Sequence, residues 1–325
     1  MSDVRMMRCH ALDGPSALRL DRVARAPLGA GEVRVRVTAA GVNHPDLLMT
    51  EGRYQARPEP PFCPGLEAAG VVIEGGVRFP PGARVIVRTG VGRPGFAEET
   101  TVPEAALLAA PEGLSDAALG GFHVAHHTAA HALVDRGRLA AGETLLVFGA
   151  GAGVGLAAVA VGRALGARVV AAAGSPGRRA AAEAAGAEAV VDSQAEDLRA
   201  AVEAVTGRGG VDAVFDPVGG RCFDAGLRVL GPEGRLLVVG FTGGMGAVPA
   251  NYALIKEIEV IGVRAGSADR RRPGTAERLH ARLMDWLAAG LLAVPEPETL
   301  PLERAAEALE RMRRREVVGK LVLIP

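Results

Sequence analysis

The chain has 325 residues, of which 49% are hydrophobic and 23% are charged, a balance that is ordinary for a soluble globular protein. Its 37 basic and 37 acidic side chains give a formal net charge of zero, which excludes the strong general field that would attract nucleic acid or an anionic membrane. The length is sufficient for two domains with a sizeable core.

The N-terminal segment and the cysteines indicate a cytoplasmic protein. Residues 1–8 carry no apolar core of the kind found in a secretory signal. Cys9, Cys63 and Cys222 are widely spaced and form no C-x-x-C pair, so neither a disulfide framework nor a zinc ribbon is indicated. The uncharged stretch 144–162 has the length of a membrane span, but its clustered glycines are typical of a turn. We expect no membrane and no nucleic-acid partner.

Up to about Gly121 the chain shows the pattern of short strands separated by turns. Strands are predicted at Glu32–Val37, Gly70–Ile73, Arg84–Val87 and Phe96–Val102. Frequent prolines and glycines between them are typical of an antiparallel, loop-rich domain.

A strand–turn–helix–strand unit follows. Thr144–Phe148 and Arg168–Ala173 are apolar runs predicted to be buried strands, and the Ala-rich Leu156–Leu165 is predicted to be a helix. Between the first strand and the helix lies the glycine-rich turn Gly149–Gly155. Glycines at such a turn let the backbone approach a pyrophosphate, which binds the N–H groups at the helix N-terminus. Because alanines hold the first two glycine positions of the G-x-G-x-x-G pattern, a glycine-rich corner of another α/β protein is the alternative.

The end of the second strand predicts NADPH as the cofactor. NAD-binding units usually place an acidic residue about 20 residues after the turn, where it holds the ribose 2′-OH. No acidic residue occurs between Thr144 and Ala182, and Ala173 occupies the place of that acid. A 2′-phosphate would instead meet a glycine, a serine hydroxyl and two guanidinium groups: Gly174, Ser175, Arg178 and Arg179.

The alternation of strands and helices predicts an α/β fold. Four further strands are expected at Glu188–Val191, Val211–Phe215, Arg235–Val239 and Glu259–Val263. Six strands with intervening helices are typical of a doubly wound parallel Rossmann sheet. Two amphipathic helices, Thr275–Ala289 and Leu302–Arg314, and a last strand, Lys320–Ile324, complete the chain.

We therefore expect a cofactor domain inserted into a discontinuous, mostly β catalytic domain. Residues 1–122 would form the first part of the catalytic domain, 123–264 the NADPH-binding domain, and 265–325 the segment that returns to the catalytic domain.

Several motifs in both domains carry a family resemblance: Ala40–Asp46, Gly52–Tyr54, Pro61–Val72, Gly149–Gly155, Leu165–Val169, Phe215–Gly220, Gly234–Gly240 and Val318–Leu323. With these motifs the chain resembles the medium-chain dehydrogenase/reductase superfamily over essentially its full length. The branch it resembles most is that of the zinc-independent, zeta-crystallin-like quinone oxidoreductases. The resemblance implies that the catalytic domain is GroES-like.

The resemblance also bears on metal binding. Zinc-dependent members of the family have a cysteine ligand where this chain has Asn43, and a histidine ligand where it has Leu66. Leucine cannot bind a metal and a neutral amide is a poor zinc ligand. The four-cysteine structural zinc lobe of those enzymes is missing as well. We expect no metal.

A histidine cluster offers the competing metal site. His123, His126, His127 and His131 include pairs with the i,i+4 spacing of one helix face. No glutamate stands between them in the H-E-x-x-H manner, so the favoured interpretation is that these histidines line the cofactor cleft or the interdomain helix.

Without zinc, hydrogen-bond donors must stabilise negative charge on a substrate oxygen. The resemblance assigns this role to Tyr54 and Asn43, with a rim-packing aromatic and a turn residue as the respective alternatives. Leu48 replaces a second family tyrosine, which makes the pocket more apolar. Thr128 and His131 match positions that contact the cofactor, although a packed helix would explain them equally. The other predicted cofactor contacts are Gly151, Ala152, Gly153, Val154, Ser193, Val239, Gly240 and Phe241.

The function implied by the resemblance is metal-free, NADPH-dependent reduction of a quinone or an α,β-unsaturated carbonyl. An enoyl-thioester reductase is the alternative within enzymes, and an NADPH-binding, crystallin-like protein with little turnover is the alternative outside them. Because Glu259–Val263 would be an exposed apolar sheet edge, we also expect a homodimer with an isologous contact near Val260–Arg264.

Overall fold

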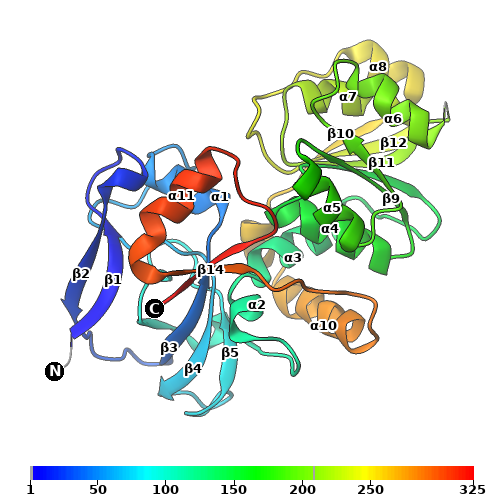
Figure 1. The fold of residues 1–325 in the computed structure, drawn as a ribbon. Coiled ribbons are helices and arrows are strands. Elements are labelled where there is room, and N and C mark those ends of the chain that lie inside the picture. The colour runs from blue at the N-terminus through cyan, green and yellow to red at the C-terminus, as the bar shows by residue number, and fades with distance from the viewer. Residues whose placement is uncertain (1–2, 208) are drawn as a thin grey trace. The chain divides into compact units, whose positions relative to one another are not determined.

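The computed structural model describes residues 3–207 and 209–325 (Figure 1). These residues form two compact units. Unit 1 comprises the chain up to Val124 together with Val294–Pro325, and unit 2 is Ala125–Ala293. Each unit has its own sheet and its own hydrophobic core, as expected for an α/β chain in which one unit interrupts the other.

Unit 2 contains the parallel six-stranded sheet that the sequence predicts. The strand order is β10-β9-β8-β11-β12-β13: the first strand, β8, lies in the middle, the next two strands are added on one side of it and the last three on the other. The strands are β8 (Thr144–Phe148), β9 (Arg168–Ala173), β10 (Ala189–Asp192), β11 (Val211–Asp216), β12 (Leu230–Val238) and β13 (Glu259–Gly262). The central strands are apolar because helices cover them on both faces.

The helices of unit 2 lie on opposite faces of this sheet. Those next to the first three strands, α4 (Gly153–Ala164) and α5 (Pro176–Ala184), cover one face, and α6 (Leu198–Thr206) and α7 (Arg221–Val229) cover the other (Figure 1). The remaining helices of the unit are α8 (Ala250–Lys256), α9 (Ala268–Arg271) and α10 (Thr275–Ala288), with a short 3-10 turn at Ala265–Ser267.

Unit 1 is built on a seven-stranded mixed sheet with the order β14-β15-β3-β4-β5-β7, in which β6 also pairs with β3. Its strands are β3 (Glu32–Gly41), β4 (Ala68–Glu74), β5 (Arg84–Val87), β6 (Glu99–Pro103), β7 (Leu107–Ala109), β14 (Glu298–Pro301) and β15 (Leu321–Ile324). A separate antiparallel hairpin consists of β1 (Asp3–Cys9) and β2 (Leu18–Ala24).

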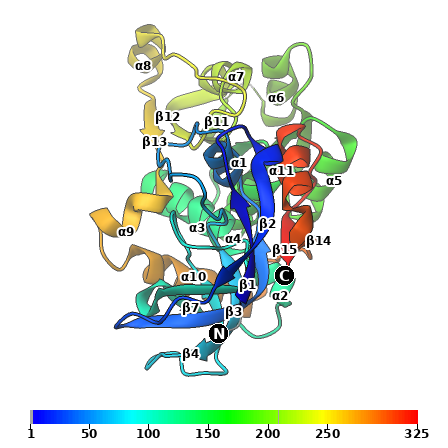
Figure 2. The ribbon, with the colours of Figure 1, turned by 90° about the vertical axis from the view of Figure 1, so that its left-hand side faces the viewer.

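Short helices complete unit 1. They are α1 (His44–Thr50), α2 (Asp116–Gly120) and α11 (Ala305–Arg313), with 3-10 turns at Pro15–Ala17, Glu104–Ala106 and Leu302–Arg304. Helix α11 lies beside α1 in both views (Figures 1 and 2). The chain passes from unit 1 to unit 2 within α3 (His123–Ala130), which continues into a π-helix at His131–Arg136. No helix in the described ranges is long and apolar enough to span a membrane.

The structure divides the chain differently from the boundaries expected above. Residues 265–293, expected to begin the returning segment, belong to unit 2. Helix α10 buries Leu279 and Leu283 there, and Arg278 forms a two-pronged ion pair with Asp135 of the π-helix. An amphipathic helix belongs with the core on which its apolar side packs, and α10 packs in unit 2.

Candidate functional site

Three polar side chains of unit 1, all largely shielded from solvent, meet where β3 pairs with two other strands. We call Asn43, Glu67 and Lys320 the Asn43 cluster. Asn43 directly precedes α1, Glu67 precedes β4, and Lys320 precedes β15. Because β3 pairs with β4 at one edge and with β15 at the other, the three segments converge at its end.

The hydrogen bonds of the Asn43 cluster fix its geometry. The Lys320 ammonium donates to Asn43 Oδ1 at 2.7 Å and to Glu67 Oε1 at 2.9 Å. Asn43 Nδ2 donates to the same Glu67 oxygen at 2.9 Å and to the carbonyl of Gly41 at 3.2 Å. Since an ammonium only donates and a carboxylate only accepts, the orientation of the amide is unambiguous. The other Glu67 oxygen accepts from Val124 N at 2.8 Å.

Beside this cluster, the Asp46 side chain in the first turn of α1 binds two backbone N–H groups. Its carboxylate accepts from the backbone N–H groups of Asn43 at 2.8 Å and of Gly65 at 3.1 Å. The side chain is fully buried, and loss of solvation raises the pKa of Asp46 to about 7 despite these hydrogen bonds.

Tyr54, the predicted donor to the substrate, is half-buried and packs at the margin of the unit 1 core. Its backbone N–H donates to the carbonyl of Leu48 at 3.1 Å, which ties the loop to the end of α1. Leu48 is itself half-buried. Tyr54 and Leu48 therefore belong to the same corner of the unit.

In unit 2, the glycine-rich turn joins the end of β8 to the N-terminus of α4. Gly149 has a φ of +62° and Gly153 a φ of +48°, values that side chains other than glycine rarely adopt. A Cβ at Gly155 would lie 2.1 Å from the carbonyl oxygen of Gly149, so this position needs glycine for close packing. Helix α4 runs for twelve residues and presents its free N–H groups at this turn. A helix N-terminus of this kind can bind an anion.

The predicted phosphate-binding residues lie on the next turn of unit 2. Ser175 caps α5 by accepting the backbone N–H of Arg178 at 3.4 Å, and Arg178 packs so closely on Gly151 that a Cβ there would lie 2.2 Å from its own Cβ. Arg179 donates to the carbonyl of Ala173 at 3.3 Å and pairs with Asp192 at 3.1 Å. The structure thus adds an acid that the sequence analysis did not consider: Asp192 faces Ala173 across the β9–β10 pair.

The other predicted cofactor residues of unit 2 lie at the carboxyl ends of its strands. Ser193 follows β10 and is buried, while Val239 and Gly240 both donate backbone N–H groups to the carbonyl of Asp216 at the end of β11. Asp216 is itself buried, and burial raises the pKa of its carboxyl group. Phe241 follows Gly240 and is exposed. Ligands of doubly wound sheets bind at these strand ends.

The histidines occupy a buried helical segment in which one ring is held by an acid. His131 Nδ1 lies 3.0 Å from Asp135 Oδ2, and Asp135 in turn accepts from Arg278. The rings of His127 and His131 stack with their centroids 6.5 Å apart. Thr128 is half-buried on the same helix. Among the described residues no group of three or more histidines, cysteines or acids is placed to hold a metal ion.

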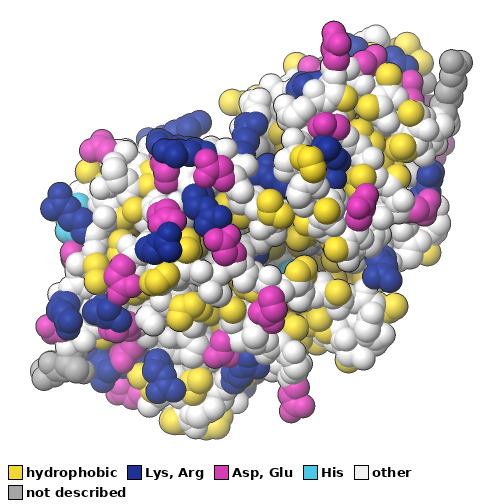
Figure 3. Space-filling view, in the orientation of Figure 1, with side chains coloured by type: hydrophobic (Ala, Val, Ile, Leu, Met, Phe, Trp, Pro, Cys, Tyr) yellow, Lys and Arg dark blue, Asp and Glu magenta, His cyan; other side chains and the backbone are white. Residues whose placement is uncertain are grey.

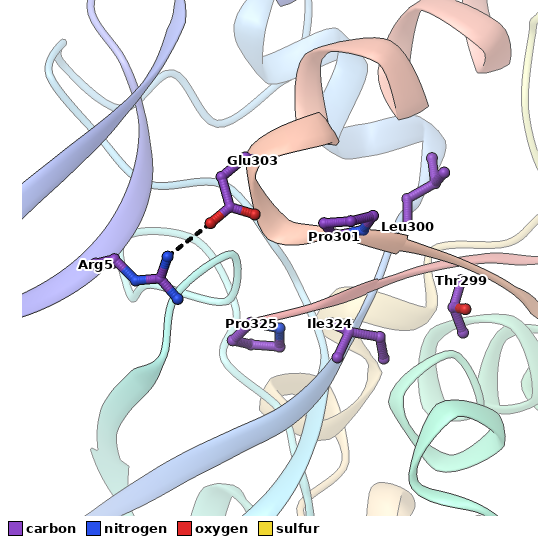
Figure 4. Close-up of a pocket in the computed structure, with 7 residues that line it drawn as sticks. All are labelled: Arg5, Thr299, Leu300, Pro301, Glu303, Ile324 and Pro325. Atoms are coloured by element: carbon purple, nitrogen blue, oxygen red, sulfur yellow. Dashed lines mark hydrogen bonds and ion pairs between the residues drawn. The ribbon is translucent and has the colours of Figure 1, made fainter.

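A pocket of about 380 Å³ lies elsewhere in unit 1, between β1 and the β14–β15 pair. Figure 4 shows Arg5 and Glu303 facing each other at its rim, 2.7 Å apart. None of the predicted catalytic or cofactor residues lines it, so we assign it no part in the site. On the face drawn in Figure 3, acidic and basic side chains are interspersed, in keeping with the net charge of zero.

Comparison with known proteins gives consistent matches. Residues 29–112 match the family model described as alcohol dehydrogenase GroES-like domain, and residues 153–283 match that described as zinc-binding dehydrogenase. Quinone oxidoreductase-like protein 2 of Bos taurus is 35% identical over 323 residues, which cover 97% of this chain and 90% of the relative.

Two solved structures extend the match to the fold. A probable oxidoreductase from Mycobacterium abscessus has a TM-score of 0.90 at 35% identity and covers 99% of both chains. The quinone oxidoreductase of Thermus thermophilus, also solved in complex with NADPH, has a TM-score of 0.86 at 32% identity and covers 99% of this chain and 100% of that one. This chain belongs to the medium-chain dehydrogenase/reductase superfamily, in its quinone oxidoreductase branch. It is an oxidoreductase.

The zinc-binding description of one family model can be tested on the donors present in this oxidoreductase. The amide of Asn43 is engaged by Glu67 and Lys320, and Leu66 has no ligating atom. An ammonium 2.7 Å from Asn43 Oδ1 and 2.9 Å from Glu67 Oε1 would repel a divalent cation held by either oxygen. The residues of this corner do not fit a catalytic zinc ion.

Sequence reasoning missed two members of the cluster. Glu67 and Lys320 stand in motifs that carry the family resemblance, yet neither was given a role. One signal was available for Lys320: of the 37 basic residues, only Lys256 and Lys320 are lysine. Asn43 was expected to donate a hydrogen bond to the substrate oxygen. In the structure both of its amide hydrogens already have acceptors within the protein.

Proposed function

We propose that this oxidoreductase reduces a quinone or an α,β-unsaturated carbonyl with NADPH and without a metal. The observation that carries the proposal is the Asn43 cluster, in which an amide, a carboxylate and an ammonium occupy the corner where zinc-dependent members of the family have their ligands. A reductase of this kind needs a place for the dinucleotide and a hydrogen-bond donor for the acceptor oxygen.

The residues of unit 2 fit the dinucleotide. The N–H groups at the N-terminus of α4, which begins at Gly153, would bind a pyrophosphate. Ser175 and Arg178 would bind a 2′-phosphate. Arg179 also pairs with Asp192, and we propose that both guanidinium groups contribute to phosphate binding. When bound, NADPH would supply the hydride.

The residues of unit 1 would act on the acceptor. The Tyr54 hydroxyl is the proposed donor to the substrate oxygen, and the apolar Leu48 beside it would favour a planar, weakly polar ring over a charged substrate. Asn43 would act indirectly, by holding the Lys320 ammonium through its side-chain oxygen. Most of the rate acceleration would come from alignment of the reactants.

A panel of acceptors tests the proposal. Purified protein is mixed with NADPH and, separately, with 1,4-benzoquinone, 9,10-phenanthrenequinone, trans-2-hexenal and crotonyl-CoA, and loss of NADPH absorbance is followed. We expect turnover with a quinone or the enal. Turnover confined to crotonyl-CoA would replace the proposal with an enoyl-thioester reductase. Tight NADPH binding without turnover of any acceptor would favour a binding role instead.

A further inference from the structure

The Lys320 ammonium has more donors than the protein provides acceptors. Its two acceptors are Asn43 Oδ1 and Glu67 Oε1, at 2.7 and 2.9 Å, whereas an ammonium carries three hydrogens. Within the described parts of the chain the third hydrogen has no acceptor. The Lys320 side chain is 15% exposed and that of Glu67 is fully buried, so the ammonium lies in a site largely shielded from water.

The neighbouring groups cannot supply this donor themselves. Both amide hydrogens of Asn43 are used, one by Gly41 and one by Glu67, and a carboxylate has none to give. An amide would lose an internal hydrogen bond to reach a substrate, whereas the ammonium would not. Lys320 is therefore the member of the Asn43 cluster that can donate outward without cost to the fold.

The composition of the chain adds an independent argument. Arginine serves as the basic residue almost everywhere, and only Lys256 and Lys320 are lysine. Lys256 donates to two backbone carbonyls, those of Arg228 and Leu230, each at 2.7 Å. Both lysines thus place a compact point charge between close acceptors, a task for which the planar fork of arginine is poorly shaped.

We propose that Lys320 donates its third hydrogen bond to the oxygen of the acceptor and stabilises the negative charge that forms there. The inference rests on the proposed function, which supplies the hydride. As the C–H bond of the dihydronicotinamide breaks, a new C–H bond forms at an electron-poor carbon conjugated with the acceptor carbonyl, and the displaced π electrons move to its oxygen. That oxygen then takes a proton from water. Lys320 acts through its hydrogen bond and its charge, in the electrostatic role that a metal ion could otherwise perform.

The test needs variants that fold. Lys320→Met alone would leave Glu67 buried without its partner, which is strongly destabilising. The informative comparison is therefore Glu67→Gln, in which the partly exposed Lys320 keeps neutral amide acceptors, against the double variant Glu67→Gln/Lys320→Met, which removes both charges. Lys320→Arg keeps the charge with altered geometry. Lys256→Met is the control for loss of a lysine elsewhere. Thermal unfolding establishes that each variant is folded.

Two readouts separate catalysis from structure. The first is kcat with the best acceptor, together with NADPH affinity from fluorescence. The second is binding of 4-nitrophenol in the presence of NADP+, where a nearby ammonium favours the yellow phenolate and lowers the apparent pKa of the bound phenol. We expect the double variant to lose about 100-fold in kcat relative to Glu67→Gln, with NADPH affinity nearly unchanged and the phenolate signal abolished. We expect Lys320→Arg to retain part of the kcat and part of the phenolate signal, and Lys256→Met to match the parent in both readouts.

Equal kcat and equal phenolate signal in Glu67→Gln and the double variant would overturn the role of Lys320 while leaving the proposed function intact. A parent protein that reduces no acceptor would instead remove the proposed function, and the inference with it.

Discussion

At the scale of single residues, we expect Arg178 to determine the choice of cofactor. Its guanidinium stays charged at any working pH and matches phosphate oxygens, and it lies on the turn that Ser175 caps. Arg178→Ala should weaken NADPH binding by about 1–3 kcal/mol and leave NADH binding nearly unchanged. Arg199→Ala, on α6 and paired with Glu203, is the control and should leave NADPH binding unchanged. Isothermal titration with both cofactors measures this, and equal affinity of the parent for NADPH and NADH would contradict it.

Asp46 gives a prediction about pH and stability. Because its pKa in the folded protein, about 7, exceeds the ordinary value of 3.8, the fold binds its proton more tightly than the unfolded chain does. The free energy of unfolding should therefore fall as pH rises from about 4 to 7, by up to about 4 kcal/mol from this group, and then level off. In Asp46→Asn this component should be missing. Thermal midpoints of both proteins across pH 4–8 test it; a difference that does not vary with pH would refute this account of Asp46.

Which site residues were predictable from sequence depends on how far apart they lie in the chain. Ser175 and Arg178 are three positions apart, so the sequence alone indicated that they lie on the same turn. The Asn43 cluster was not, since Glu67 and Lys320 are separated by 253 positions and meet only through the pairing of β3 with β4 and β15. Asp192 was missed for the same reason, because its partner Arg179 belongs to a neighbouring strand–helix unit.

At the scale of elements, strands buried on both faces were predicted best. β5, β8 and β9 have the predicted bounds, because every residue after the first in each strand is apolar and buried. The β1–β2 hairpin was missed because β2 mixes polar and apolar residues and only its first residue is buried, so no apolar run marks it. The π-helix at His131–Arg136 has no pattern in the sequence, since one wide turn leaves no repeat to detect.

The contact between the α4 turn and α5 yields the prediction at this scale. A Cβ at Gly151 would lie 2.2 Å from the Cβ of Arg178, so Gly151→Val must push α5 away from the turn. We expect NADPH binding to weaken at least tenfold while far-ultraviolet circular dichroism keeps its parental shape. Gly209→Val, where a Cβ meets nothing within 4 Å, is the control and should bind normally. Normal NADPH affinity in Gly151→Val would show that the turn does not hold the cofactor.

At the scale of the whole molecule, the edge of the unit 2 sheet predicts association. β13 is the last strand of its sheet, and Val260 on it is exposed, as are Leu254 and Ile255 on α8, both by three quarters or more. An uncovered apolar edge favours pairing with a second copy across a two-fold axis. We predict a homodimer near Val260–Arg264 that Val260→Lys weakens, whereas Val77→Lys, at an exposed position of unit 1, should not. Light scattering at micromolar concentration decides this, and a monomeric parent would contradict it.

The central claim concerns the whole molecule as an enzyme: that hydrogen-bond donors of the protein, and no metal, serve the acceptor oxygen. The measurement that tests it most directly is NADPH-dependent reduction of the best acceptor before and after exhaustive chelation, with zinc determined by elemental analysis in the same samples. We expect far less than one zinc per chain and unchanged activity after chelation. One zinc per chain, lost together with activity and restored with it, would contradict the account and transfer the role of Tyr54 and Lys320 to a metal acting as Lewis acid.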